Sequence, residues 1–443
     1  MTTRHTLMTT VLGLLLALPA HANAASGPLR LSLRDALRRA VQRHVNVIIA
    51  NERIQQAMAR LGQARSVLLP QISAGVSETH QTRNLESSGI SLPGREPLVG
   101  PFNAFDARIR LTQVLFDASA LERFQAARAG RQLSLAESDK ARQDVLALVA
   151  VLYLEAARAA EALEVTHAVL DLDEERVRIA RLNRDLGTGS SLALDEAQAA
   201  LDASRHRWSA AVAEATERRL DVAAAVGLSP NEPVVFVSEP SDHAVPLLSD
   251  QTVGAALAGH PDITVARMAV DEQKAERAAE RASFLPTASA EADYGVNGRR
   301  PDDTEQTYSF GAQVSLPVFD GGLRAARIRE ASSRVREGEA HLDDAQRQVE
   351  AKILEASAAI DAADALVRAT DASLGVALSQ LILARHRLQT GLGSDLDVLE
   401  ALTQVAQARN ERDEAAAAQQ ISRVNVAHAM GRMEQLLAPE TLR

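Results

Sequence analysis

The strongest constraint on this chain is that its sequence contains one pattern twice. Short landmarks recur in the same order, at an offset of 216 residues early in the pattern and of 204 residues later on. The matching landmarks are His44 with His260, Leu69-Pro70 with Leu285-Pro286, Gly187-Thr188-Gly189-Ser190 with Gly391-Leu392-Gly393-Ser394, and Val226-Gly227 with Met430-Gly431. Self-similarity of this length indicates a duplicated structural unit. We therefore expect two repeats, at 25–230 and 250–433, joined by a proline-rich linker at 231–249 and followed by a tail at 434–443.

Each repeat contains a stretch that suits a very long helix. No proline lies between residues 101 and 230 or between 317 and 439, and proline interrupts helix interiors. From Ile353 to Leu388, every seventh residue is large and apolar, and small residues fill the alternate core positions. The large set is Ile353, Ile360, Val367, Leu374, Leu381 and Leu388, and the small set is Ala356, Ala363, Thr370, Ala377 and Ala384. This heptad pattern predicts a seam along which two helices pack closely.

The same reading gives the other helices. Long helices are expected at about 118–186 and 323–390, each roughly 100 Å long at about 1.5 Å per residue. Glycine-containing turns lead into return helices at about 190–227 and 394–431. An earlier helix is expected from Leu31 to Leu69, with Ser32 as its N-cap. Its counterpart, from about 250 to 285, should be interrupted at His260-Pro261, because a residue before proline avoids helical geometry.

Four shorter segments alternate polar and apolar residues, which is typical of strands with one face of each kind. They lie at about 71–82, 105–116, 287–296 and 307–319. In the second of them Arg108 and Arg110 fall on the polar face. Seven of the twelve aromatic residues of the chain cluster in or beside these segments, as the interfacial girdle of a membrane barrel requires. They are Phe102, Phe105, Phe116, Tyr294, Tyr308, Phe310 and Phe319.

Four such strands cannot stand alone, because a sheet with an apolar face and two free edges exposes both. In a membrane the free edges would be costlier, so the sheet must close into a barrel. Three chains would supply twelve strands, which suits an outer-membrane barrel. The alternative is a soluble sandwich in which the apolar face packs on another sheet, although the helices leave little chain to cover it.

The N-terminus and the composition add a location and exclude some partners. Residues 1–24 have the basic start, apolar run and small-x-small site of a secretory signal peptide. No other apolar run is long enough to predict a membrane-spanning helix. The chain has no cysteine, and its net charge of −10 with no basic block makes nucleic acid an improbable partner. Its only lysines are Lys140, Lys274 and Lys352.

The order of these elements, with Leu-Pro before the first strand and Phe-Asp before the long helix, resembles the TolC-type outer-membrane efflux proteins over the whole mature chain. The sharpest motif is Gly391-x-x-Ser394-x-Leu396-Asp397-Val398-Leu399-Glu400-Ala401, which is similar to the family's helix-hairpin signature at the periplasmic tip. A looser version begins at Gly187.

The resemblance implies a fold that is mainly α with membrane β. Three chains would form a twelve-stranded barrel in outer-membrane lipid, continued by a coiled-coil tunnel in the periplasm of a Gram-negative bacterium. This homotrimer would receive cargo from an inner-membrane transporter through a periplasmic adaptor. The cargo would be drugs, metal ions or secreted proteins, and the sequence does not choose among them.

By the same resemblance, Asp397 and Glu400 occupy positions of an acidic ring that constricts the periplasmic entrance. Residues three apart share a helix face, and acidic rings favour cations. The competing interpretation is that acids in a first helical turn stabilise the helix dipole and are otherwise solvated. Asp395 is expected to be the N-terminal cap of this helix.

Further candidates lie at the turns and in the barrel. The residues expected to shape the hairpin tips for adaptor docking are Gly187, Gly189, Ser190, Gly391, Gly393 and Ser394. The family's polar links between the two hairpin tips are in doubt here, because Ala193, Leu388 and Gly393 stand where polar, aromatic or basic partners are expected. Arg108 and Arg110 are expected to face the lumen and tune selectivity, or only to hydrate the wall.

Enzymatic chemistry finds no support. The sequence has no Gly-x-x-x-x-Gly-Lys, no Gly-x-Ser-x-Gly and no His-Glu-x-x-His. Its histidines and methionines form no ligand spacing, so we expect neither a cofactor nor a metal site. The alternative to a channel is a soluble periplasmic coiled-coil scaffold or adaptor. An adaptor would have one helical hairpin inserted in β domains, whereas this sequence predicts two hairpins and two strand pairs.

Overall fold

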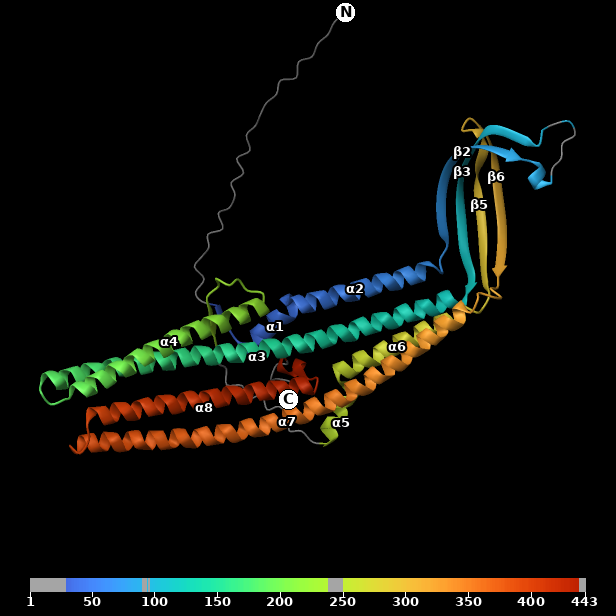
Figure 1. Ribbon diagram of the computed structural model, residues 1–443. Helices are drawn as coiled ribbons and strands as arrows, with labels where there is room; N and C mark the ends of the chain where they lie inside the picture. Colours follow the sequence, from blue (N-terminus) through green and yellow to red (C-terminus); the bar gives the residue numbers. More distant parts are fainter. Residues whose placement is uncertain (1–28, 90–93, 95, 238–249, 438–443) are drawn as a thin grey trace, which may run out of the picture.

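A computed structural model describes residues 29–89, 94, 96–237 and 250–437. The expected signal peptide, most of the linker and the last six residues of the tail lie outside the described residues. The chain forms a long helical rod with a four-stranded sheet at one end (Figure 1).

The two repeats share one core order of two short helices, two strands, a long helix and a return helix. The first contains β1 (Leu29–Leu31), α1 (Leu33–Arg43), α2 (Val45–Ser66), β2 (Gln71–Asn84), η1 (Glu86–Ser88), β3 (Leu98–Asp117), α3 (Ala118–Asp185), α4 (Ser191–Ala225) and β4 (Val234–Phe236). The second contains α5 (Asp250–Gly259), α6 (Pro261–Ala282), β5 (Thr287–Arg300), β6 (Asp303–Ser315), α7 (Leu323–Gln389), α8 (Asp395–Ala429) and η2 (Met433–Leu437).

The first helix of repeat 1 is broken, contrary to the single helix expected from Leu31 to Leu69. At His44 the backbone is extended (φ −66°, ψ 132°), and the ring Nδ1 accepts a hydrogen bond from the Asn46 N–H at 3.2 Å. His260 caps α6 in the same way, through the Asp262 N–H at 3.2 Å. A histidine cap therefore separates two helices in both repeats, although only the second break has a proline.

The strand ends differ from the expected ones. β3 begins at Leu98 rather than near residue 105, and β6 covers 303–315 rather than 307–319. β2 ends at Asn84 and β5 at Arg300, so both run further than their alternating patterns. The extensions of β2, β5 and β6 are polar, and that of β3 interrupts its alternation with Gly100-Pro101; all are held by ladder bonds between neighbouring strands.

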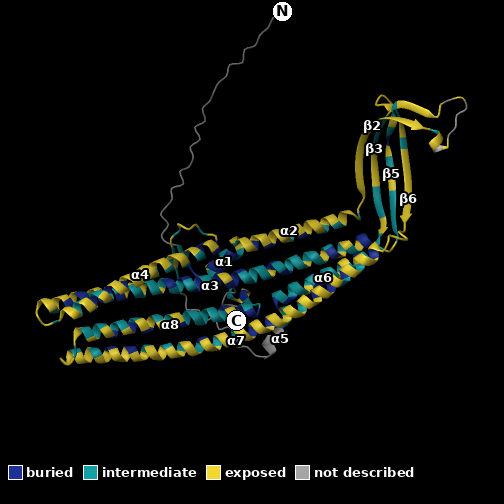
Figure 2. Cartoon of the chain, in the orientation of Figure 1, coloured by how far each residue is buried: buried dark blue, intermediate teal, exposed yellow. Residues whose placement is uncertain are grey.

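The four strands form one antiparallel sheet in the order β2-β3-β5-β6. Arg110 of β3 lies between Ser73 of β2 and Asp293 of β5, so the polar face is continuous across strands. The other face exposes large apolar side chains, among them Tyr308 (82% exposed) and Phe310 (79%). β2 and β6 have no partner on their outer edges in the described chain, and both are the exposed strands in Figure 2.

The helices form a four-membered layer at each level of the rod. Toward the sheet, α3 packs against α2 and α6, and α7 packs against α6. Toward the far end, α3 packs against α4 and α8, and α7 packs against α8 (Figure 1). α2, α4 and α7 are thus the outer helices. Each layer, like the sheet, has two free sides.

The predicted heptad seam is the contact between α7 and α8. Its members Ile353, Ala363, Ala377 and Leu381 are buried, and the lower part packs on Ala401, Val405 and Ala408 of α8. The rest of α7 is largely exposed (Figure 2). Among the described helices, α7 also contains an 18-residue window apolar enough to span a membrane by length and composition. No such window was expected outside the N-terminus. Only 11% of it is buried in the chain, so packing on α8 does not account for its apolar composition.

Candidate functional site

Both hairpin tips are built by the same pair of glycines. Gly187 and Gly391 have positive φ (75° and 74°) and directly follow the helix C-caps. The next residue donates back to the helix, Thr188 to the Asn183 carbonyl at 2.9 Å and Leu392 to the Arg387 carbonyl at 2.8 Å. This is the Schellman arrangement, which favours glycine because a side chain is strained at positive φ.

The second glycine of each tip has a different physical role. A Cβ on Gly189 would lie 3.0 Å from the Cβ of Asn183, and one on Gly393 would lie 3.0 Å from the Cβ of Arg387. Each turn therefore folds back tightly onto the end of its long helix. The position where the resembled family led us to expect a basic side chain has no room for one without a shift in the turn.

The N-cap of α8 is Ser394, so the expected cap Asp395 is wrong. The Ser394 hydroxyl accepts from the Asp397 N–H at 3.3 Å, and the Asp397 carboxylate accepts from the Ser394 N–H at 2.7 Å. This reciprocal capping box satisfies two amide donors, whereas the Asp395 side chain lies one position too late to close it. Ser190 caps α4 through the Ala193 N–H at 3.1 Å, and alanine at that position offers no return bond.

The cap changes the expectation for the acidic ring. Hydrogen bonds from Ser394, and the nearby Arg387, hold the pKa of Asp397 below its usual range, so the carboxylate is charged but engaged. Glu400 is exposed and has no hydrogen bond or ion pair among the described residues. Of the two predicted ring residues, Glu400 is the one whose carboxylate is free to meet solvent or a cation.

The two tips have no polar link to each other within the described chain. The nearest polar contact between the hairpins lies well back from the turns, where Arg158 of α3 donates to Glu414 of α8 at 3.2 Å. Ala193 and Leu388 contribute no polar side-chain group there. The doubt about the family's tip latch is thus supported for one isolated chain.

On the polar face of the sheet, Arg108 is held by carboxylates. Its Nε donates to Asp106 Oδ1 at 2.6 Å and its Nη1 to Asp293 Oδ1 at 3.0 Å, and Asp293 also receives the Ser309 hydroxyl. A Cβ on Gly295 would lie 2.5 Å from the Arg108 Cβ, so the close approach requires glycine. The acids and the serine were not among the predicted site residues. The alternation of polar and apolar residues predicted which face these side chains lie on, but not which of them pair with Arg108.

Arg110 lies on the same face of the sheet as Arg108 but is not held by carboxylates. It is exposed and has no hydrogen bond or ion pair among the described residues. Of the two arginines predicted to face a lumen, Arg108 is therefore neutralised and positioned, and Arg110 has an exposed positive charge without a bonded partner in the described chain.

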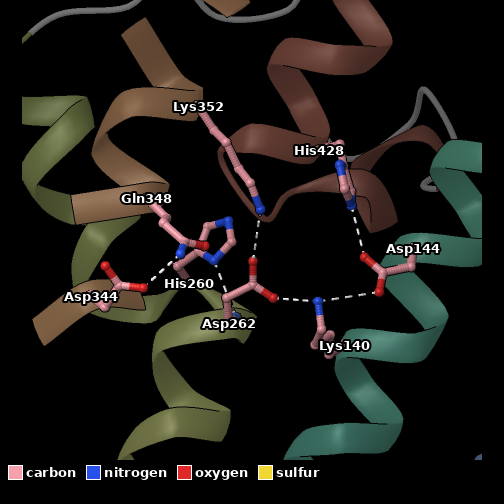
Figure 3. A network of polar contacts seen from close by, with 8 residues as sticks. All are labelled: Lys140, Asp144, His260, Asp262, Asp344, Gln348, Lys352 and His428. Carbon is pink, nitrogen blue, oxygen red and sulfur yellow. Dashed lines mark hydrogen bonds and ion pairs between the residues drawn. The ribbon is translucent and has the colours of Figure 1, made fainter. Parts of the chain in front are cut away.

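A second polar network lies midway along the rod, where α6 begins and α8 ends (Figure 3). Lys140 of α3 forms ion pairs with Asp262 of α6 and, at 3.3 Å, with Asp144 of α3. Asp262 also pairs with Lys352 of α7 at 3.5 Å, and Asp144 with His428 of α8 at 2.9 Å. The network joins one helix of repeat 1 to three helices of repeat 2.

The mutual pairing keeps Lys140, Asp144 and Asp262 charged despite partial burial. Burial raises the pKa of Asp262 and of Asp144, but the bonds from Lys140 and from His428 outweigh it and lower both. Burial lowers the pKa of Lys140, and its carboxylate partners reverse that shift and raise it. His260 beside them is 5% exposed and its Nε2 has no partner among the described residues. Its pKa is lowered, mainly by burial.

No group of three or more histidine or acidic side chains in the described part of the chain is arranged to hold a metal ion. The candidate functional features are therefore the two hairpin tips, the polar face of the sheet and the polar network midway along the rod.

Comparison with known proteins gives a consistent assignment. The model of the family "Outer membrane efflux protein" matches residues 36–228 and 252–432, one segment in each repeat. The outer membrane efflux protein BepC of Brucella suis is 25% identical over 228 residues, covering 50% of this chain and 49% of that protein. The alkaline protease secretion protein AprF of Pseudomonas aeruginosa is 28% identical over 252 residues, covering 52% and 50%. The chain thus spans about half the length of the curated relatives it matches.

The fold is shared with solved structures. The crystal structure of the Campylobacter jejuni CmeC outer membrane channel superposes with a TM-score of 0.77 at 19% identity, covering 90% of this chain and 85% of that one. At this identity the likeness concerns the fold.

Proposed function

Because the chain belongs to the outer membrane efflux protein family, we propose that it forms the exit duct of an export machine. Its place is the outer membrane of a Gram-negative bacterium, with the helical rod in the periplasm. The family is one of channels rather than enzymes. The duct would take cargo from an inner-membrane transporter and pass it across the periplasm and the outer membrane.

The observation that carries this proposal is that every level of the molecule has two free sides. The sheet ends in β2 and β6. The helical layer near the sheet ends in α2 and α7, and the layer at the far end of the rod ends in α4 and α7. Copies joined side by side would pair these edges at all three levels at once. We propose a homotrimer, which closes twelve strands into a barrel and twelve helices into a tunnel at each level.

The faces of the sheet support the same closure. The apolar face, with Tyr308, Phe310 and Val314 strongly exposed, would lie against outer-membrane lipid. The opposite face, with Arg108, Arg110 and Asp293, would line the lumen. Alternation of this kind is required in a water-filled barrel surrounded by hydrocarbon.

The two ends of the duct would have separate tasks. At the periplasmic end, the turns around Gly187 and Gly391 would dock a periplasmic adaptor, and a ring of Glu400, flanked by Asp397, would narrow the entrance. In the barrel, free Arg110 side chains would set the charge preference of the exit. BepC is named as an efflux protein and AprF as a protease secretion protein, so both multidrug or metal efflux and type I protein secretion are candidate functions.

The test combines fractionation with electrical recording. Membranes are extracted with and without detergent, and the purified protein is added to a planar bilayer. We expect the chain in the outer-membrane fraction only, soluble only with detergent, and stepwise conductance in the bilayer. A chain released without detergent that gives no conductance would instead identify the soluble scaffold.

A further inference from the structure

The midway network is specific to one of two junctions that the duplication creates. In the fold, α3 of repeat 1 packs against α6 and α8 of repeat 2. In the proposed trimer, α7 of repeat 2 would pack in the same manner against α2 and α4 of the next chain. The first junction lies within a chain and the second between chains, and equivalent positions in the two repeats can be compared directly.

The junction within the chain is joined by one ion pair and one hydrogen-bonded pair. Lys140 of α3 pairs with Asp262 in the first turn of α6, and Asp144 of α3 pairs with His428 in the last turn of α8 at 2.9 Å. An acid at a helix start and a histidine at a helix end also suit the helix dipoles. α3 is thereby tied to both helices of the other repeat at the point where they meet.

The equivalent positions between chains lack every one of these charge pairs. Lys140 corresponds to Asp344, Asp144 to Gln348, Asp262 to Asn46, His428 to Ala224 and Lys352 to Leu148. Asp344 and Gln348 hydrogen-bond each other at 2.7 Å on α7 (Figure 3). The duplication has therefore kept the helix arrangement and changed the chemistry of one junction.

The choice of residue supports a dedicated role. The chain contains 48 lysines and arginines, of which only three are lysines, and two of those three meet at Asp262. An ammonium group is a compact charge with three donors, and it can bridge carboxylates that approach from different directions, as Lys140 does.

We propose that the Lys140–Asp262 and Asp144–His428 pairs lock the two repeats of one chain together, and that the tunnel dilates at the unlocked boundaries between chains. This inference rests on the proposed trimer. Each chain moves as a block at this level, and the boundary lined by Asn46 and Ala224 on one chain and by Asp344 on the next supplies the freedom to open.

The test transfers the lock to the boundary. The double variant Asn46→Asp with Asp344→Lys creates a cross-chain copy of the Lys140–Asp262 pair, and Asn46→Asp alone is its control. Open probability in planar bilayers should fall about fivefold in the double variant, because an exposed ion pair changes an equilibrium constant by up to about fivefold. The effect should fade in about 1 M salt, where the screening length is about 3 Å. The single variant, which adds no pair, should not close the channel.

A second arm examines the existing lock. Lys140→Asp alone gathers three acids at the junction and should increase the open probability, and Lys140→Asp with Asp262→Lys should restore it by reversing the pair. Unchanged opening in Asn46→Asp with Asp344→Lys and in Lys140→Asp alone, measured on a trimer that still conducts, would overturn the lock. An unmodified chain that neither trimerises nor conducts would overturn the proposed function instead.

Discussion

At the scale of single residues, the structure separates charged groups that are engaged from those that are free. Asp397 and Arg108 are held by caps and counter-charges, whereas Glu400 and Arg110 have no partner in the described chain. Sequence periodicity places all four on the correct elements. It cannot tell which of two neighbouring charges is neutralised, because that depends on partners as distant as Asp293.

Glu400→Gln is therefore expected to reduce the cation preference of the channel more than Asp397→Asn does. The first change removes a free charge, and the second removes a charge that already serves the helix cap while keeping an oxygen acceptor for it. Reversal potentials in a potassium chloride gradient measure the preference, and Asp395→Asn is the matched control in the same turn. Equal effects of all three substitutions would remove Glu400 from the entrance.

The two capping histidines predict a stability loss in mild acid. The Nδ1 atoms of His44 and His260 accept hydrogen bonds, which a protonated ring cannot do. Burial lowers the pKa of both below 6.5 in the fold. Around His260, Asp262 opposes this shift, and His428, Lys352 and Lys140 reinforce it.

The unfolded chain therefore binds protons first as the pH falls. The contribution of the neutral rings is complete above pH 6.5 and is lost as the pH drops from there toward the lower folded values. Thermal melting followed by circular dichroism should show a lower midpoint at pH 5.5 than at pH 7.5. Because asparagine caps helices without titrating, the double variant His44→Asn with His260→Asn should flatten this difference. A variant with an undiminished pH dependence would contradict the account.

Gly295 gives a sharp steric test on the lumen face. A Cβ there would lie 2.3 Å from the Ala107 carbonyl and 2.5 Å from the Arg108 Cβ, so Gly295→Ala must move a strand or the arginine. Overpacking of this kind costs about 1–3 kcal/mol. Gly311→Ala, where nothing lies within 4 Å, should be nearly neutral. The temperature at which the barrel unfolds on a heated denaturing gel distinguishes the two, and equal temperatures would refute the close approach.

At the scale of elements, the duplication and the heptad predicted the long helices well because their signals repeat over many turns. The break at His44 was missed because no proline marks it, although its match to His260 could have indicated it. The cap of α8 was misplaced because two acids and a serine compete within four positions. The strand ends were misplaced because the segments beyond the alternating patterns show no regular alternation, as at Leu98 to Phe102, and only pairing with a neighbouring strand fixes them.

The α7–α8 seam yields a prediction at this scale. Ile353 is 2% exposed, and Ile353→Ala should destabilise the helical domain by about 2–5 kcal/mol, because it removes a buried side chain and leaves a cavity. Glu355→Ala, on an exposed position of the same turn, is the control and should change stability little. Denaturant unfolding followed by helix content measures both. A loss below about 1 kcal/mol for Ile353→Ala would contradict the seam.

At the scale of the whole molecule, the free edges of sheet and helical layers are the observation from which the account proceeds. The midway network was beyond sequence reasoning, because Lys140 and Asp262 meet only when the two repeats pack. The rarity of lysine was visible in the sequence but gave no partner. The sequence did indicate that the sheet must close into a barrel, because four amphipathic strands cannot leave two open edges.

The most direct measurement of the central claim is the native mass of the detergent-extracted protein. One full-length chain has a mass of 47.4 kDa. The account predicts a single species of three chains, resistant to dilution, in which all the paired edges hold the assembly together. A species of one chain or two chains, in the same detergent and with the sheet intact by circular dichroism, would contradict it.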